Sequence, residues 1–170
     1  NEFEATKRKL NEMNEQEVTI AEALKGVGYQ TAHISKWHLG DAAHYPETQG
    51  FDVNIGGDWS GAPPTYFYPY EKRKRKLETM PPGGKDGEYL TDRLTDEALK
   101  ILDRVKDGPF YLNLCYHTVH TPIEGKPDLI QKYQKKIQPG MHHQNAGYAA
   151  MVQSLGQRVH LTRPLPSDSP

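Results

Sequence analysis

The sequence predicts an α/β fold in which a mixed, mainly parallel sheet is flanked by helices. Two short apolar runs, 29–34 and 110–116, are of the kind that form buried strands. A short helical pattern and a tight glycine turn precede the first run, and a longer amphipathic pattern precedes the second. Because a helix, a tight turn and a strand make up half of a right-handed βαβ crossover, this order favours a parallel sheet.

Length and composition exclude several classes of protein. The 170 residues suffice for one domain or part of one, and the formal net charge is -1 at pH 7. A basic run, 72–76, is offset by carboxylates elsewhere, so we expect no nucleic-acid partner. No apolar stretch approaches the roughly 20 residues of a membrane helix, and 1–10 is charged rather than a signal peptide, so we expect a soluble chain without a membrane partner.

The amino-terminal half carries one short helix and two predicted strands. Thr19 and Glu22 have the spacing of a capping box, which starts a helix that extends to Leu24. The strand 29–34 follows at once, and 50–55 is a second strand candidate.

The middle of the chain, 56–87, predicts a long loop that is either a functional insertion or disordered. Glycines, prolines and tyrosines accumulate there without a sustained period. A rigid aromatic patch is expected over 63–70, and the basic run follows it directly. Such a run is typical of nuclear-localisation or heparin-type signals and also of solvated loops, and we favour the solvated loop.

The carboxyl-terminal half predicts three helices and a strand. Over 88–106 apolar residues recur at offsets of three and four, which predicts an amphipathic helix packed on the sheet. Asp-Gly-Pro ends this helix, and the strand 110–116 follows. Further helices are predicted over 127–134 and 146–155, whereas the Pro-rich sequence from 162 onward cannot continue a helix.

Polar side chains follow both main strands where each strand ends. Lys36 and His38 come after the first strand, and His117 and His120 come after the second. Because ligands of parallel sheets bind beyond the carboxyl ends of the strands, we expect these side chains to face one crevice. A plain surface loop is the alternative interpretation of Lys36 and His38 taken alone.

A lysine and imidazoles at one sheet edge suit an oxyanion. The Lys36 ammonium would bind sulfate or phosphate oxygens, and His38 and His120 would donate to a non-bridging oxygen or transfer a proton. This set predicts hydrolysis of an anionic ester. A zinc site on His117 and His120 has no evident third ligand, and Cys115, inside an apolar strand, is expected to be an inert core residue rather than a nucleophile.

Several stretches closely resemble the formylglycine-dependent sulfatases. They are 19–40 with its Ser-Lys-Trp-His-Leu-Gly, the tripeptide Gly-Phe-Asp at 50–52, the helix start at 87–95, and 109–122 with its His-Thr-Val-His-Thr-Pro. The resemblance covers about 17–155. It implies an alkaline-phosphatase-like fold and a sulfuric ester hydrolase whose partner is a sulfated small molecule or a sulfated glycan.

The resemblance also implies roles for single residues. In the family, the lysine that matches Lys36 bridges the sulfate and the formylglycine, and the histidine that matches His38 helps to expel sulfate from the covalent intermediate. The histidine that matches His120 binds the sulfate and can protonate the leaving alcohol. His117 would bind substrate, although many relatives carry no histidine at that position.

The chain departs from the family pattern in the other half of the centre. It contains no Cys/Ser-x-Pro/Ala-x-Arg motif, which supplies the formylglycine nucleophile. The paired acids that hold calcium, the later Asp-Asn pair and the second sulfate-binding lysine are absent as well. Ca2+ is therefore expected for the intact family enzyme, with its ligands outside this chain, and Ser35 replaces the glycine that usually precedes the lysine.

The chain is therefore interpreted as an internal fragment of a sulfatase, in keeping with the absence of an initiating Met. The polar lead-in 1–16 would be a solvated helix or a frayed segment, 17–155 a partial catalytic domain, and 156–170 a divergent Pro-rich tail. We expect the parent to be secreted or periplasmic, and the isolated chain to be inactive. The alternatives are a non-catalytic module that binds sulfated glycans and a phosphoester hydrolase of the same superfamily.

Overall fold

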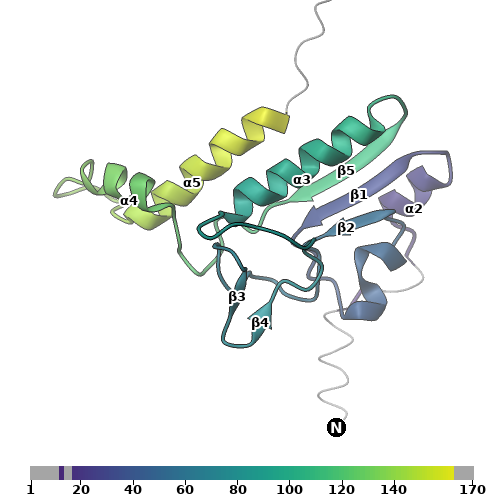
Figure 1. The fold of residues 1–170 in the computed structure, drawn as a ribbon, viewed down its shortest axis with the longest axis horizontal. Coiled ribbons are helices and arrows are strands. Elements are labelled where there is room, and N and C mark those ends of the chain that lie inside the picture. The colour runs from purple at the N-terminus through teal and green to yellow at the C-terminus, as the bar shows by residue number, and fades with distance from the viewer. Residues whose placement is uncertain (1–11, 14–16, 163–170) are drawn as a thin grey trace, which may run out of the picture.

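A three-stranded parallel sheet forms the centre of the computed structural model, which describes residues 12–13 and 17–162. The strands are β1 (Gln30–Ser35), β2 (Val53–Ile55) and β5 (Phe110–Cys115), and their order is β2-β1-β5 (Figure 1). The prediction of a mainly parallel sheet flanked by helices is thereby confirmed. The predicted lead-in helix and the Pro-rich tail lie largely outside the described residues.

The central strand β1 is buried on both faces, in two different ways. On one face Ala32 and Ile34 pack into the apolar core. On the other face Thr31, His33 and Ser35 are buried polar residues. Buried polar groups are costly unless they are hydrogen-bonded, so each of these three must find partners on neighbouring segments.

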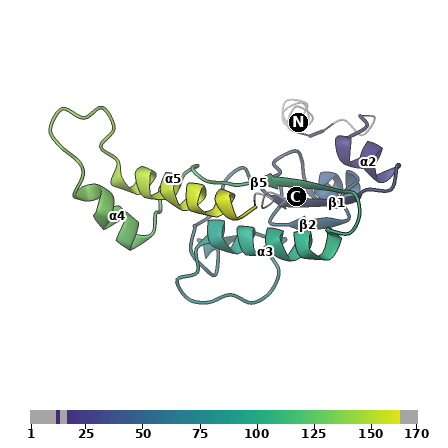
Figure 2. The ribbon, with the colours of Figure 1, turned by 90° about the horizontal axis from the view of Figure 1, so that it is seen from above.

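Helices cover the two faces of the sheet. Helix α2 (Ile20–Lys25) starts at the predicted capping box, in which Glu22 N donates to Thr19 Oγ1 and Thr19 N donates to the Glu22 carboxylate. Helix α3 (Leu90–Val105) buries an apolar stripe against β1. Figure 2 shows α3 on one side of the sheet and α2 on the other. Both helices were predicted from pattern alone.

Helices α4 (Pro127–Gln134) and α5 (Ala146–Val159) form a pair that extends away from the sheet (Figure 1). Helix α4 has the predicted bounds, whereas α5 is longer than predicted and continues into a 3-10 turn, His160–Thr162. An isolated glycine costs a helix only about 1 kcal/mol, so Gly156 does not end α5. Arg158, in its last turn, donates to Asp92 of α3 at 2.6 Å.

Part of the predicted long loop folds into an antiparallel hairpin. Strand β3 (Glu71–Lys72) pairs with β4 (Arg75–Lys76), so the basic run is exposed, as predicted, but ordered. The aromatic residues before it do not form a surface patch throughout. Tyr66 and Tyr70 are 0% and 3% exposed and belong to the apolar core. The solvated-loop prediction concerns the basic run alone; that run is exposed, as predicted, but it forms a hairpin rather than a loop.

Two short 3-10 helices, Ala42–His44 and Pro46–Thr48, connect the end of β1 to β2. None of the helices in the described part of the chain has the length and apolar character needed to cross a membrane.

Candidate functional site

The ends of β1 and β5 meet at the same level of the sheet. Ser35 pairs with Cys115 as the last residue of each strand. Lys36 N then donates to Cys115 O at 2.9 Å, which carries the pairing one residue further. The two polar loops predicted from the sequence, after β1 and after β5, therefore leave the sheet side by side.

The loop after β1 is held by aromatic packing and by backbone contacts. Trp37 Nε1 donates to His44 O at 2.7 Å, and its ring lies edge-on to His33 at 4.9 Å between ring centroids. His38 N donates to Asp58 O at 3.1 Å. The His38 ring is exposed and lies directly against Gly61, where a Cβ atom would come within 2.5 Å of it. These contacts fix Trp37 and His38, the two residues that follow Lys36 in the loop.

The loop after β5 is closed on itself. His120 N donates to His117 O at 2.8 Å, and Tyr66 Oη donates to the carbonyl oxygens of both His117 and His120. The His120 ring is exposed, and its Nδ1 donates to Thr121 O at 2.9 Å. Because a carbonyl only accepts, the proton of the neutral ring sits on Nδ1, and Nε2 is the ring nitrogen available to a ligand.

His117 is the shared neighbour of the two loops. It is 3% exposed, and its Nδ1 shares a hydrogen bond with Ser35 Oγ at 2.8 Å. Burial, and to a smaller extent the nearby charge of Lys36 and the imidazole of His120, lower the pKa of His117 to about 3. The ring is therefore neutral at pH 7. Among the described residues, its Nε2 is the buried side-chain nitrogen without a hydrogen-bond partner.

The predicted residues are therefore not equivalent in position. Lys36 and His120 both act on the charge state of His117, so the ends of two strands contribute to one cluster. His38 is connected to this cluster through the backbone of its own loop and lies on the Asp58–Gly61 segment. Their catalytic and binding roles stay predictions.

His33 is a site-supporting residue that the sequence did not predict. Its Nε2 donates to Ser35 O at 3.0 Å, and its Nδ1 accepts from Asn113 Nδ2 at 3.1 Å. Burial lowers the pKa of His33 to about 4. The ring thus holds the last residue of β1 just before Lys36. A histidine at an alternating position inside an apolar strand is the signal that could have indicated this role.

Metal ligands and a reactive thiol are the remaining predictions about the site. In the part of the chain that the structure describes, no three His, Cys, Asp or Glu side chains are grouped so that they could hold a metal ion. The described residues therefore do not fit a calcium site. Burial raises the pKa of Cys115, whose Sγ donates to Asn113 Oδ1, so the group stays a thiol rather than a nucleophilic thiolate.

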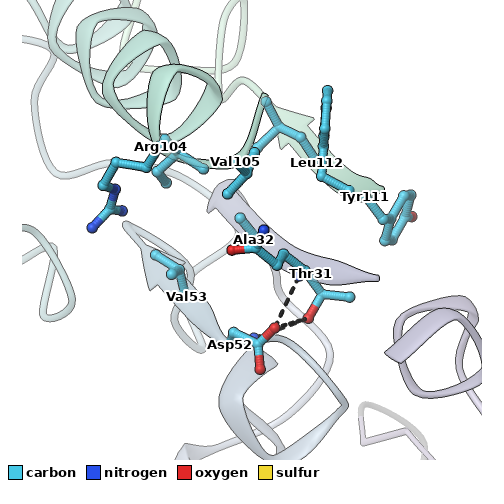
Figure 3. A pocket seen from close by; sticks show the side chains of 11 residues that line it. Thr31, Ala32, Asp52, Val53, Arg104, Val105, Tyr111 and Leu112 are labelled. Carbon is cyan, nitrogen blue, oxygen red and sulfur yellow. Dashed lines mark hydrogen bonds between the residues drawn. The ribbon is translucent and has the colours of Figure 1, made fainter. Parts of the chain in front are cut away.

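A separate pocket of about 390 Å³ lies at the opposite ends of the strands (Figure 3). Its residues include the first positions of β1 and β5 and the last turns of α3. Asp52 is the acid there, and its Oδ2 accepts from Thr31 N and Thr31 Oγ1 while Oδ1 pairs with Lys25 at 2.6 Å. The pKa of Asp52 is held below its usual value mainly by the Lys25 ammonium and, to a smaller extent, by the hydrogen bonds from Thr31. The pocket therefore offers a satisfied carboxylate and no reactive group.

Comparison with known proteins gives one consistent result. A sequence model of the family described as Sulfatase matches residues 2–161. The uncharacterized sulfatase YdeN of Escherichia coli (strain K12) is 30% identical over 170 residues, which cover 84% of this chain and 28% of YdeN. The N-acetylgalactosamine-6-sulfatase of Homo sapiens is 30% identical over 136 residues, which cover 70% of this chain and 25% of that protein. The chain thus spans about a quarter of the length of these curated relatives.

Solved structures agree with these relatives. The crystal structure of Ps i-CgsB superimposes with a TM-score of 0.64 and 25% identity, over 88% of this chain and 36% of that one. The structure of Ps i-CgsB in complex with k-i-k-neocarrahexaose gives a TM-score of 0.65 and 26% identity, over 86% of this chain and 36% of the other.

Proposed function

The chain belongs to the sulfatase family, and from this premise we propose that it supplies the sulfate-binding part of a sulfuric ester hydrolase. Its family membership and its alkaline-phosphatase-like α/β fold agree with the resemblance in the sequence. The observation that carries the proposal is the cluster at the strand ends, where Ser35 is hydrogen-bonded to the buried His117 and where Lys36 and His120 lie near enough to lower the pKa of that ring. A cation and imidazoles at one edge of a parallel sheet are suited to a tetrahedral anion.

Each residue of the cluster has a distinct task in this proposal. The Lys36 ammonium binds a non-bridging sulfate oxygen as a compact positive charge. His120, when protonated on Nε2, gives that proton to the alkoxide as the sulfur–oxygen bond of the ester breaks, so that a neutral alcohol leaves. His38 assists the release of sulfate. His117 contributes a hydrogen bond without charge, because its lowered pKa keeps it neutral.

The remaining chemistry would come from elsewhere in the whole enzyme. We propose that formylglycine supplies the attacking group and that Ca2+ is held by ligands that this chain does not contain. The substrate class is a sulfated small molecule or glycan. The binding of k-i-k-neocarrahexaose to Ps i-CgsB supports a glycan.

Anion binding by the complete chain tests the proposal. We expect 4-nitrophenyl sulfate to perturb the NMR signals of Lys36, His117 and His120, and Lys36→Ala to weaken this binding by at least about tenfold. Lys135→Ala, which removes the exposed cation at the C-cap of α4, is the matched control and should bind like the unchanged chain. Equal binding by the two variants would contradict the proposal.

A turnover assay addresses the division of tasks. With 4-nitrophenyl sulfate and Ca2+, the complete chain should release no nitrophenol above the blank, because the attacking group is not among its residues. Clear turnover would contradict this. Binding of 4-nitrophenyl phosphate in preference to the sulfate would favour the phosphoester alternative instead.

The second candidate function is a non-catalytic module for sulfated glycans. The exposed basic hairpin β3–β4 favours it, since such a surface attracts anions without any catalytic group. The two candidates differ in the role of Lys36. Glycan binding that survives Lys36→Ala undiminished would favour the module over the hydrolase.

A further inference from the structure

The basic run is displayed on a fixed surface, not on a solvated loop. Residues 71–76 form the hairpin β3–β4, and all six are exposed. Arg73 and Lys74 form its turn with φ angles of 52° and 64°, the left-handed conformation that a tight two-residue hairpin requires. Directly before and after it, Tyr70 and Leu77 are buried in the core, so the hairpin is anchored at its base.

Two of the cations tie the hairpin to the loops of the candidate site. Arg75 donates to Ser60 Oγ at 2.9 Å, and its guanidinium lies 5.7 Å from the ring centroid of Trp59. Lys72 donates to Glu124 at 3.1 Å. Glu124 also accepts from Tyr66 N, and the Tyr66 hydroxyl binds the loop of His120.

The segment 58–61, to which Arg75 is hydrogen-bonded, also contacts His38. Asp58 O accepts from His38 N, and Gly61 lies against the His38 ring. Trp59 and Ser60 stand between these two contacts. Figure 1 shows the hairpin on the side of the molecule where β1 and β5 end. The basic hairpin is therefore next to the cluster at the strand ends.

The other three cations form no ion pair in the described part of the chain, although Glu71 lies opposite Lys76 in the hairpin. Arg73, Lys74 and Lys76 are exposed, and no carboxylate within that part forms an ion pair with them. Like charges held close together on an ordered hairpin repel one another, which an incoming anion would relieve. Trp59, whose ring lies under Arg75 of the same hairpin, is 50% exposed, an unusually open position for the largest apolar side chain.

We propose that Trp59 and the three unpaired cations form a second subsite, which binds a further sulfate group and a sugar ring of a polysulfated glycan while Lys36 holds the sulfate to be cleaved. The inference rests on the proposed function and deepens it. An indole face packs on the apolar C–H face of a sugar ring, and the neighbouring guanidinium and ammonium groups pair with sulfate oxygens. The substrate would then be a carbohydrate with several sulfate groups rather than a small aryl sulfate.

The test compares two ligands and two charge-matched variants of the complete chain. The ligands are k-i-k-neocarrahexaose and 4-nitrophenyl sulfate, with desulfated hexaose as the ligand control. The variant R73Q/K74Q/K76Q removes the three cations, and R104Q/K135Q/K136Q removes three exposed cations elsewhere. The first variant should weaken hexaose binding roughly tenfold at low salt. Each exposed pair of a cation and a sulfate group contributes little to the binding free energy, but the contributions of the three pairs add. Trp59→Ala should weaken it roughly fivefold.

Binding of 4-nitrophenyl sulfate separates this inference from the proposed function. Neither the hairpin variant nor Trp59→Ala should change it by more than about twofold. Equal losses of hexaose affinity in the two triple variants would overturn the subsite, since the attraction would then be unspecific charge. Loss of aryl sulfate binding in Lys36→Ala, with no effect of the hairpin variant on the hexaose, would overturn the subsite and leave the proposed function standing. A hairpin-dependent affinity for hexaose without any Lys36-dependent binding would support the subsite and contradict the proposed function.

Discussion

The two ends of the parallel sheet differ in how fully their polar groups are satisfied. At the amino ends, the pocket of about 390 Å³ contains Asp52, whose two oxygens are bound by Thr31 and Lys25. At the carboxyl ends, His117 has a buried nitrogen without a partner, and Lys36 has no ion pair within the described residues. Buried polar groups are nearly always paired, so the unpaired nitrogen of His117 distinguishes the carboxyl ends of the strands from the amino ends.

The two ends of the sheet also differ in how they affect the stability of the folded chain. The amino end gains stability from its bonds and needs no ligand. The carboxyl end keeps two buried imidazoles, His33 and His117, in the neutral form. The proposed anion site would thus be maintained with a loss of stability in acid.

The largest expected effect is a loss of stability between pH 7 and pH 5. The folded pKa values of His117 and His33, about 3 and about 4, lie below the unfolded value, so the unfolded chain binds more protons. Their contribution is complete above the unfolded pKa of about 6.5 and is lost as the pH falls from there toward the folded values. At pH 5 each group would lower the free energy of unfolding by about 2 kcal/mol.

Urea unfolding at the two pH values measures this effect. In His117→Asn, where an amide stands in for the ring, about half of the pH-dependent loss should disappear. The carboxylates with lowered pKa values, such as Asp92 and Glu97, titrate below this window and should not contribute. Equal stability of the unchanged chain at pH 7 and pH 5 would show that the imidazoles are not buried as described.

The next effect separates the two ends directly. Asp52→Ala leaves the amide of the buried Thr31 without an acceptor, which should cost about 2 kcal/mol of unfolding free energy. The exposed pair with Lys25 adds little. Binding of 4-nitrophenyl sulfate should stay the same, because the site lies at the other end of the strands. A tenfold loss of that binding would erase the distinction between a structural and a functional end.

Local patterns predicted the framework of the sheet well. The run 29–34, the stripe on 88–106 and the capping box each depend on residues close in sequence, and the structure places all three elements within two residues of the prediction. The hairpin β3–β4 escaped prediction because strands of two residues, all charged, have no apolar alternation.

The environment of the candidate site depends on contacts that no local pattern records. Ser35 and His117, which share a hydrogen bond, are 82 positions apart, so the burial of the imidazole follows only from the pairing of β1 with β5. The sequence alone places Tyr66 in an aromatic patch, because the residues that its hydroxyl binds lie 51 and 54 positions away. The sequence indicates which groups follow the strands, whereas the fold determines which of them are neutral, exposed or supported.

The smallest expected effect concerns the support of the carboxyl end by Tyr66. Tyr66→Phe keeps the buried ring and removes the hydroxyl that binds His117 O and His120 O, which should cost about 1 kcal/mol of unfolding free energy. His117 O still accepts from His120 N, so the loop should stay closed and aryl sulfate affinity should fall by no more than about threefold. Tyr148→Phe, at an exposed tyrosine of α5, is the matched control and should change neither quantity. An unchanged stability in Tyr66→Phe would mean that the backbone alone positions His120. The loop at the carboxyl ends of the strands would then need no side-chain support of this kind.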